Sequence, residues 1–261
     1  MDRTGYAPVN GLDMYYEVHG AGAPLVLVHG ALSGIGTSFG AVLPMLAKDH
    51  QVIAVELQAH GRTADIDRPL TVPQLAADVV GVLDHLGIDR ADVFGYSLGA
   101  AIALQLGTAH PDRVDRLVLA SVSYQVDGMH PGLLDGIAQL QPEHLFGSPF
   151  HEEYLGVAPD PEAFASLVAK VKELDSDLPE WSAAAVQALE APTMVVAGDS
   201  DIIRPEHAVE MFRLLGGGVV GDMVGLPRCR LAILPGTTHT SLTGRADWLA
   251  SMVEEFLTRT A

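Results

Sequence analysis

The stretch Gly95-Tyr96-Ser97-Leu98-Gly99 is the part of the sequence that decides the fold. It stands between a short apolar strand ending at Val93-Phe94 and an alanine-rich helical run at 100–106. Glycines two places before and two places after Ser97 let a strand and a helix approach closely, so the serine can occupy a strained turn with its hydroxyl exposed. Ser97 is therefore a candidate nucleophile, and the alternative is an ordinary turn between a strand and a helix.

Strands and helices alternate on both sides of this turn. A first strand is predicted at 15–18, and continuous apolar runs, typical of buried strands, stand at 25–28, 51–55, 91–94, 114–120, 193–197 and 230–234. Apolar residues at helical spacing occur at 39–46, 75–86 and 248–257. This pattern predicts an α/β fold with a mostly parallel sheet, helices on both faces and ligands bound at the carboxyl ends of the strands.

Residues 123–190 interrupt the alternation. They contain helical patterns, several prolines and no convincing strand, so we interpret them as a helical cap inserted after the sixth strand. The core then consists of residues 1–122 and 191–261. The cap is rich in aromatic and apolar side chains, some of which are expected to line a pocket for an apolar substrate: Tyr124, Met129, Phe146, Phe150, Tyr154 and Trp181.

Composition excludes several classes of partner. The chain has 261 residues and a formal net charge of −18, so nucleic acid and anionic lipid are expected to be repelled. No apolar run is long enough for a membrane span and the N-terminus lacks a secretory pattern, so a cytoplasmic location is expected. The single Cys229 excludes an internal disulfide and a cysteine-based metal cluster. Glycines at 20–22 precede a strand, which argues against a dinucleotide-binding loop.

Further candidate residues follow other predicted strands. His29-Gly30 follows the strand at 25–28, and His239 follows the last strand. Two carboxylates stand in Gly198-Asp199-Ser200-Asp201, and Asp127, beyond the sixth strand, is a more remote candidate acid. A serine hydroxyl attacks a carbonyl only when a base removes its proton, and a histidine oriented by a carboxylate is the usual base.

Together these residues resemble the α/β-hydrolase family over essentially the whole chain. The order Ser97, Asp201, His239, each after its own strand, is the triad order of that family. The resemblance implies an eight-stranded sheet. It also favours Asp201 over Asp199, because the family usually places its acid three residues after the glycine, here Gly198.

The resemblance also implies an oxyanion hole. His29-Gly30 matches the His-Gly loop of the family, whose following residue, Ala31, supplies one backbone amide, and Leu98 supplies the other. His29 and Gly30 are expected to support this loop, and Gly95 and Gly99 the turn at the serine.

Two features depart from the family pattern. Where the family commonly has D-x-x-G-H-G, this chain has Glu56 and Ala59, which removes no catalytic group. The stretch from Gly216 to Pro227 is longer than usual, and is interpreted either as a surface excursion or as a contact with a second subunit in a homo-oligomer.

A serine at position 97 of this turn argues against haloalkane dehalogenases and epoxide hydrolases, two classes of the family that have an aspartate nucleophile at the same place. The expected activity is hydrolysis of carboxylic esters of small, mainly apolar substrates through an acyl-enzyme, with no cofactor and no metal. Lactone opening is the alternative, and a ligand receptor with slow or single turnover is the alternative of another class. Carbon–carbon bond hydrolysis is disfavoured because residues 123–190 contain no arginine, although Lys170 or Lys172 could substitute.

Overall fold

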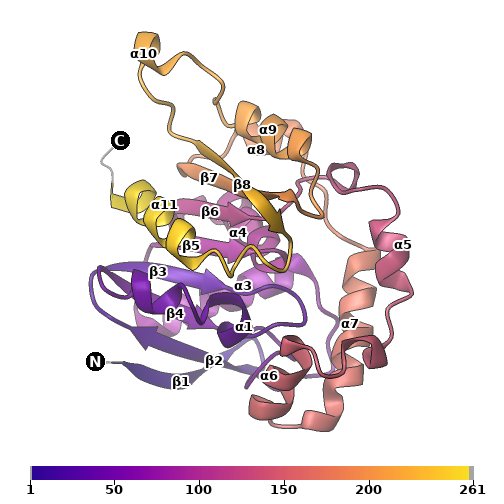
Figure 1. Cartoon of the computed structure of the whole chain (residues 1–261). Coiled ribbons are helices and arrows are strands. Elements are labelled where there is room, and N and C mark those ends of the chain that lie inside the picture. Colours follow the sequence, from indigo (N-terminus) through magenta and orange to yellow (C-terminus); the bar gives the residue numbers. More distant parts are fainter. Residues whose placement is uncertain (1, 259–261) are drawn as a thin grey trace.

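The computed structural model describes residues 2–258. Its eight strands form one sheet in the order β1-β2-β4-β3-β5-β6-β7-β8 (Figure 1). The strands are β1 (Arg3–Val9), β2 (Leu12–His19), β3 (Ala23–Val28), β4 (His50–Val55), β5 (Ala91–Tyr96), β6 (Val114–Ala120), β7 (Thr193–Ser200) and β8 (Arg230–Thr238). β2 pairs antiparallel with both β1 and β4, and the remaining pairs are parallel. The predicted α/β class and the mostly parallel sheet are confirmed.

Helices cover both faces of the sheet. They are α1 (Ile35–Phe39), α2 (Leu43–Leu46), α3 (Val72–Leu86), α4 (Leu98–Ala109), α9 (Pro205–Leu214) and α11 (Ala246–Thr258). Side chains alternate along a strand, so Val26 and Val28 of β3 enter the core beneath α3, α4 and α9, whereas Leu25 and Leu27 enter the core beneath α1, α2 and α11. This double burial explains the continuous apolar run of β3.

Three elements differ from the sequence prediction. β1 was not predicted, because an edge strand with exposed residues, Gly5 and Pro8 lacks a clear apolar pattern. The single helix expected at 39–46 is two short helices, α1 and α2, separated by 40–42. β8 continues past Leu234 to Thr238, so His239 directly follows the strand.

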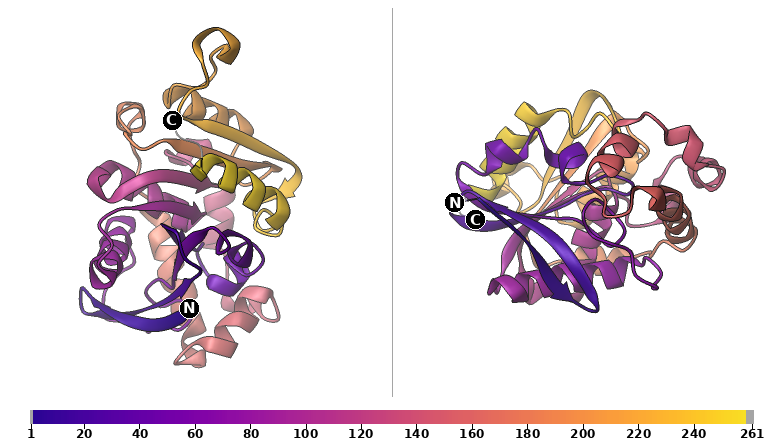
Figure 2. Two further views of the ribbon diagram at one scale, coloured as in Figure 1. Left: turned by 90° about the vertical axis from the view of Figure 1, so that its left-hand side faces the viewer. Right: turned by 90° about the horizontal axis from the view of Figure 1, so that it is seen from below.

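The segment between β6 and β7 leaves the sheet and carries α5 (Leu133–Ala138), α6 (Pro149–Val157), α7 (Phe164–Ser176) and α8 (Ala183–Gln187). Figure 1 shows α5, α6 and α7 beyond the end of the sheet toward which β3 and β8 point, and the two views in Figure 2 show them as a layer beside the sheet. Short 3-10 turns η1 to η4 lie at Pro111–Arg113, Val126–Gly128, Pro142–Leu145 and Pro161–Ala163.

The stretch from Gly216 to Pro227 carries α10 (Gly221–Val224) and projects from the body next to β8 (Figures 1 and 2). Its apolar side chains are exposed, among them Val220, Met223 and Leu226. In the part of the chain that the structure describes, no helix has the length and apolar character needed to cross a membrane.

Candidate active site

Ser97 occupies the turn between β5 and α4 with φ 55° and ψ −120°, a backbone conformation that L-residues rarely adopt. The turn is possible because its two glycines have no side chain. A Cβ at Gly95 would collide with the carbonyl of Gly99, and a Cβ at Gly99 would collide with the carbonyl of Val28. The Ser97 amide donates to Ala120 of β6 over 2.9 Å. The local sequence therefore forces the strained turn.

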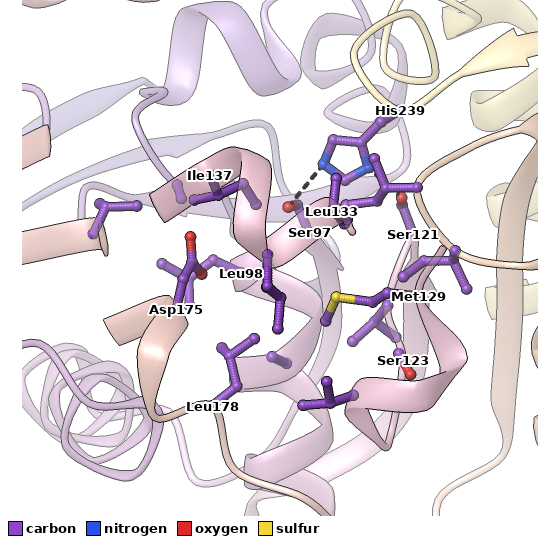
Figure 3. A pocket seen from close by; sticks show the side chains of 18 of the residues that line it. Ser97, Leu98, Ser121, Ser123, Met129, Leu133, Ile137, Asp175, Leu178 and His239 are labelled. Carbon is purple, nitrogen blue, oxygen red and sulfur yellow. Dashed lines mark hydrogen bonds between the residues drawn. The ribbon is translucent and has the colours of Figure 1, made fainter. Parts of the chain in front are cut away.

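Ser97, His239 and Asp201 come together at the carboxyl ends of β5, β8 and β7. Figure 3 shows the hydrogen bond between Ser97 and His239. His239 Nε2 lies 3.0 Å from Ser97 Oγ, and His239 Nδ1 lies 2.9 Å from Asp201 Oδ1. Both distances are hydrogen-bond distances. A proton on Nδ1 directed at the carboxylate leaves Nε2 free to accept the proton of Ser97.

Asp201 is buried, and its carboxylate is surrounded by donors. Burial opposes ionisation, but hydrogen bonds from His239, Ser121 and the Gly198 amide outweigh it and lower the pKa of Asp201 below its ordinary value. The Ile202 amide donates over 2.7 Å as well. The carboxylate is thus held ionised and in one orientation toward the imidazole.

Ser121 is part of this cluster and was missed by the sequence analysis. Its Oγ donates to Asp201 Oδ1 over 2.6 Å and lies 2.6 Å from His239 Nδ1. Ser121 is the first residue after β6, and its φ is 60°. Because it contacts the imidazole on the Asp201 side, it is placed to orient the acid and the histidine. The sequence feature that could have identified Ser121 is its position directly after a predicted strand.

The other candidate acids lie in different surroundings. The exposed Asp199 accepts from the amides of Gly236 and Thr237 over 2.9 and 3.1 Å, which lowers its pKa and ties β7 to β8. Asp127, in η2, contributes its backbone carbonyl to the guanidinium of Arg204. Neither carboxylate contacts His239 among the described residues.

The amides of Ala31 and Leu98 flank the serine turn. Neither donates a hydrogen bond to another residue in 2–258, and both residues line the cavity that contains Ser97. Gly30 packs closely on the turn, because a Cβ there would lie 3.2 Å from the Cβ of Ser97. This places the loop after β3 beside Ser97.

Two buried histidines brace this loop. His29 Nδ1 donates to the Gly30 carbonyl, and its Nε2 accepts from the Leu57 amide over 3.0 Å. His60 Nε2 accepts from the Leu32 amide over 3.1 Å. Burial lowers the pKa of His29 to about 4 and that of His60 to about 3, so both are neutral. They act on the loop through hydrogen bonds.

The departures at Glu56 and Ala59 are accommodated next to this loop. Glu56 is buried, and its carboxylate accepts from the Arg62 amide and guanidinium. Burial raises the pKa of Glu56 to about 7. Ala59 has φ 65°, a backbone conformation that favours glycine over alanine.

A cavity of about 320 Å³ opens next to Ser97 and His239 (Figure 3). Its walls are mostly apolar. They come from the serine turn and from the segment between β6 and β7, and include Leu98, Met129, Leu133, Ile137, Leu178 and Trp181. Lys172 and Asp175 of α7 are the charged exceptions. Of the two lysines considered from sequence, only Lys172 lines it; Lys170 instead binds Asp65. Among the described residues, no group of three or more His, Cys, Asp or Glu is arranged to hold a metal ion.

Comparisons with known proteins identify the family of this chain. The model of the alpha/beta hydrolase fold family matches residues 23–215. The 2-hydroxymuconate semialdehyde hydrolase of Pseudomonas sp. strain CF600 is 30% identical over 273 residues, which cover 91% of this chain and 88% of that protein.

Two solved structures resemble the whole chain. The enol-lactonase of Burkholderia xenovorans LB400 has a TM-score of 0.72 at 23% identity, with 97% of this chain and 100% of that chain covered. The carboxylesterase CesB of Bacillus subtilis has a TM-score of 0.72 at 18% identity, with 100% and 93% covered. At these identities the likeness concerns the fold.

The site and fold together define a serine hydrolase of the alpha/beta class. The chain belongs to the alpha/beta hydrolase fold family. Within this family one fold carries several reactions, so the bond that is cleaved has to be argued from the pocket.

Proposed function

We propose that this protein hydrolyses carboxylic esters of small, mainly apolar substrates, with Ser97 as nucleophile, His239 as general base and acid, and Asp201 as the residue that orients His239. The observation that carries the proposal is the 3.0 Å contact between Ser97 Oγ and His239 Nε2 at the edge of an apolar cavity. Residues 123–190 act as the cap over this cavity, and residues 1–122 and 191–261 form the core.

The reaction follows from these positions. Ser97 Oγ attacks the ester carbonyl while its proton moves to His239 Nε2. The carbonyl oxygen becomes an oxyanion and accepts hydrogen bonds from the Ala31 and Leu98 amides; losing one such donor typically costs about 3 kcal/mol of transition-state stabilisation. The proton on Nε2 passes to the leaving alcohol, and the acyl group stays on Ser97. Water then repeats the sequence, which releases the acid and restores the serine.

Ser97 is preferred to Ser121 as the nucleophile for two geometric reasons. Ser97 contacts the imidazole nitrogen that Asp201 leaves free, whereas Ser121 contacts the nitrogen that faces Asp201. Ser121 is 2% exposed and its hydroxyl proton is directed at Asp201. Ser121 therefore supports the acid and the base.

Lactone opening uses the same machinery and is the second candidate, supported by the fold likeness to the enol-lactonase. Carbon–carbon bond hydrolysis is a third candidate, which two observations favour. The Pseudomonas relative is a 2-hydroxymuconate semialdehyde hydrolase, and Lys172 supplies a cation in the cavity wall.

The test is a substrate panel with the purified protein: p-nitrophenyl esters from acetate to decanoate, acyl-homoserine lactones and 2-hydroxymuconate semialdehyde. We expect the esters to be turned over many times, with an optimum at a short or medium chain. Higher catalytic efficiency on a lactone or on the semialdehyde would move the function to that reaction. A single stoichiometric burst without turnover would identify a receptor-like protein and overturn the proposal.

A further inference from the structure

The cavity wall contains one carboxylate that the proposed reaction does not use. Asp175 lies near the end of α7, lines the cavity and is drawn in Figure 3 with Leu98, Ile137 and Leu178 around it. Among residues 2–258, no hydrogen bond or ion pair is found for its side chain. An ionised carboxylate is a strong acceptor, and one without a partner in an apolar wall is unfavourable unless a ligand or water meets it.

The lysine that lines the same cavity does not pair with this carboxylate. Lys172 also lines the cavity, but its Nζ donates to the backbone carbonyl of Leu140 over 2.9 Å. Burial alone raises the pKa of Asp175 to about 6, with no contribution from Lys172. Asp175 is therefore ionised at neutral pH and available to a ligand.

We propose that Asp175 is a specificity-determining residue, and that it selects substrates bearing an ammonium group on the part of the molecule held away from the reacting carbonyl. The apolar walls contact the carbon skeleton, and the carboxylate binds the cation at its far end. The formal net charge of −18 also attracts cations to the protein. This inference rests on the proposed function for its substrate class, but the binding of the cation can be tested without turnover.

The first experiment compares isosteric esters. In the first pair, choline butyrate is compared with its neutral isostere, in which carbon replaces the charged nitrogen of the alcohol part. In the second pair, two p-nitrophenyl esters differ by the same replacement of nitrogen by carbon in the acyl part. The measured quantity is the ratio of kcat/KM for the charged and neutral members. In one of these two ester pairs, we expect the Asp175→Asn variant to have a ratio about tenfold lower than that of the wild-type protein. Glu173→Gln, which removes an exposed charge from the same helix, should leave it unchanged.

The second experiment separates this inference from the proposed function. Butyltrimethylammonium is titrated into the Ser97→Ala protein and into the Ser97→Ala/Asp175→Asn double variant, and heat is measured. We expect binding in the first and about tenfold weaker binding in the second, whether or not any ester is a substrate. Equal binding, or an unchanged ratio in both ester pairs, would overturn the inference. A preference of the wild-type protein for anionic acyl chains would overturn it in favour of Lys172.

Discussion

Ser121 Oγ and His239 Nδ1 lie 2.6 Å apart, on the side of the imidazole that faces Asp201. Asp201 Oδ1 accepts from both groups, over 2.6 Å from Ser121 and 2.9 Å from His239. The three side chains form a closed triangle that holds the imidazole with Nε2 directed at Ser97. Ser121 therefore helps to hold Asp201 and His239 in position, although it is not one of the three triad residues.

The two neighbouring aspartates should differ sharply in effect. Asp201→Asn should lower kcat about 10⁴-fold, as expected when the tautomer of the histidine is no longer fixed. Asp199→Asn should lower it less than about tenfold, because Asp199 accepts hydrogen bonds from the Gly236 and Thr237 amides and the Ser200 hydroxyl, and not from His239. Steady-state ester hydrolysis measures both. The reverse order would transfer the orienting role to Asp199.

Glu153 of α6, in the segment between β6 and β7, binds the loop that follows Ala31. Its carboxylate accepts from the amides of Gly34, Gly36 and Thr37 over 3.0, 2.7 and 3.1 Å, at the start of α1. Glu153→Gln removes the charge and should lower the free energy of unfolding by about 1–2 kcal/mol, measured by urea denaturation. Glu152→Gln, in the exposed neighbour, is the matched control. Equal effects would mean that the contact contributes nothing specific.

The Ser97 turn requires glycine at position 95. A Cβ there would also approach Ala100 Cα to 2.6 Å, so Gly95→Ala should destabilise the protein by more than about 3 kcal/mol or prevent folding. Gly156→Ala, in α6, is the control because nothing lies within 4 Å of the added Cβ, and it should stabilise by up to about 1 kcal/mol. Thermal unfolding of both variants measures this. A fully stable Gly95→Ala protein would contradict the packing described for the turn.

The sequence predicted the residues that strand periodicity places at the carboxyl edge, and it missed those that depend on distant packing. Ser97, Asp201 and His239 each follow an apolar run, so their neighbourhood could be inferred from the parallel sheet alone. Ser121 follows a strand too, but no glycine pattern marks it. Glu153 meets Gly36 across 117 residues of chain, and Asp175 faces the cavity on a helix whose periodicity does not distinguish cavity from core.

Asp175 makes stability depend on pH in a defined direction. Its pKa is raised to about 6 in the folded protein and is near 3.8 in the unfolded chain, so the unfolded state releases its proton first. Between these values stability falls as pH rises, and the full penalty is present above about pH 6. Asp175→Asn should therefore raise Tm at pH 7 and lose this advantage below about pH 4. An equal difference at both pH values would show that Asp175 is not desolvated.

The identity of the nucleophile is tested most directly by labelling with a fluorophosphonate and mapping the adduct by mass spectrometry. Trypsin separates the two serines, because Ser97 falls in the peptide 91–113 and Ser121 in the peptide 117–170. We predict one adduct on Ser97 in the wild-type protein and in Ser121→Ala, and neither adduct nor ester hydrolysis in Ser97→Ala. An adduct on Ser121, or hydrolysis that survives Ser97→Ala, would contradict the account.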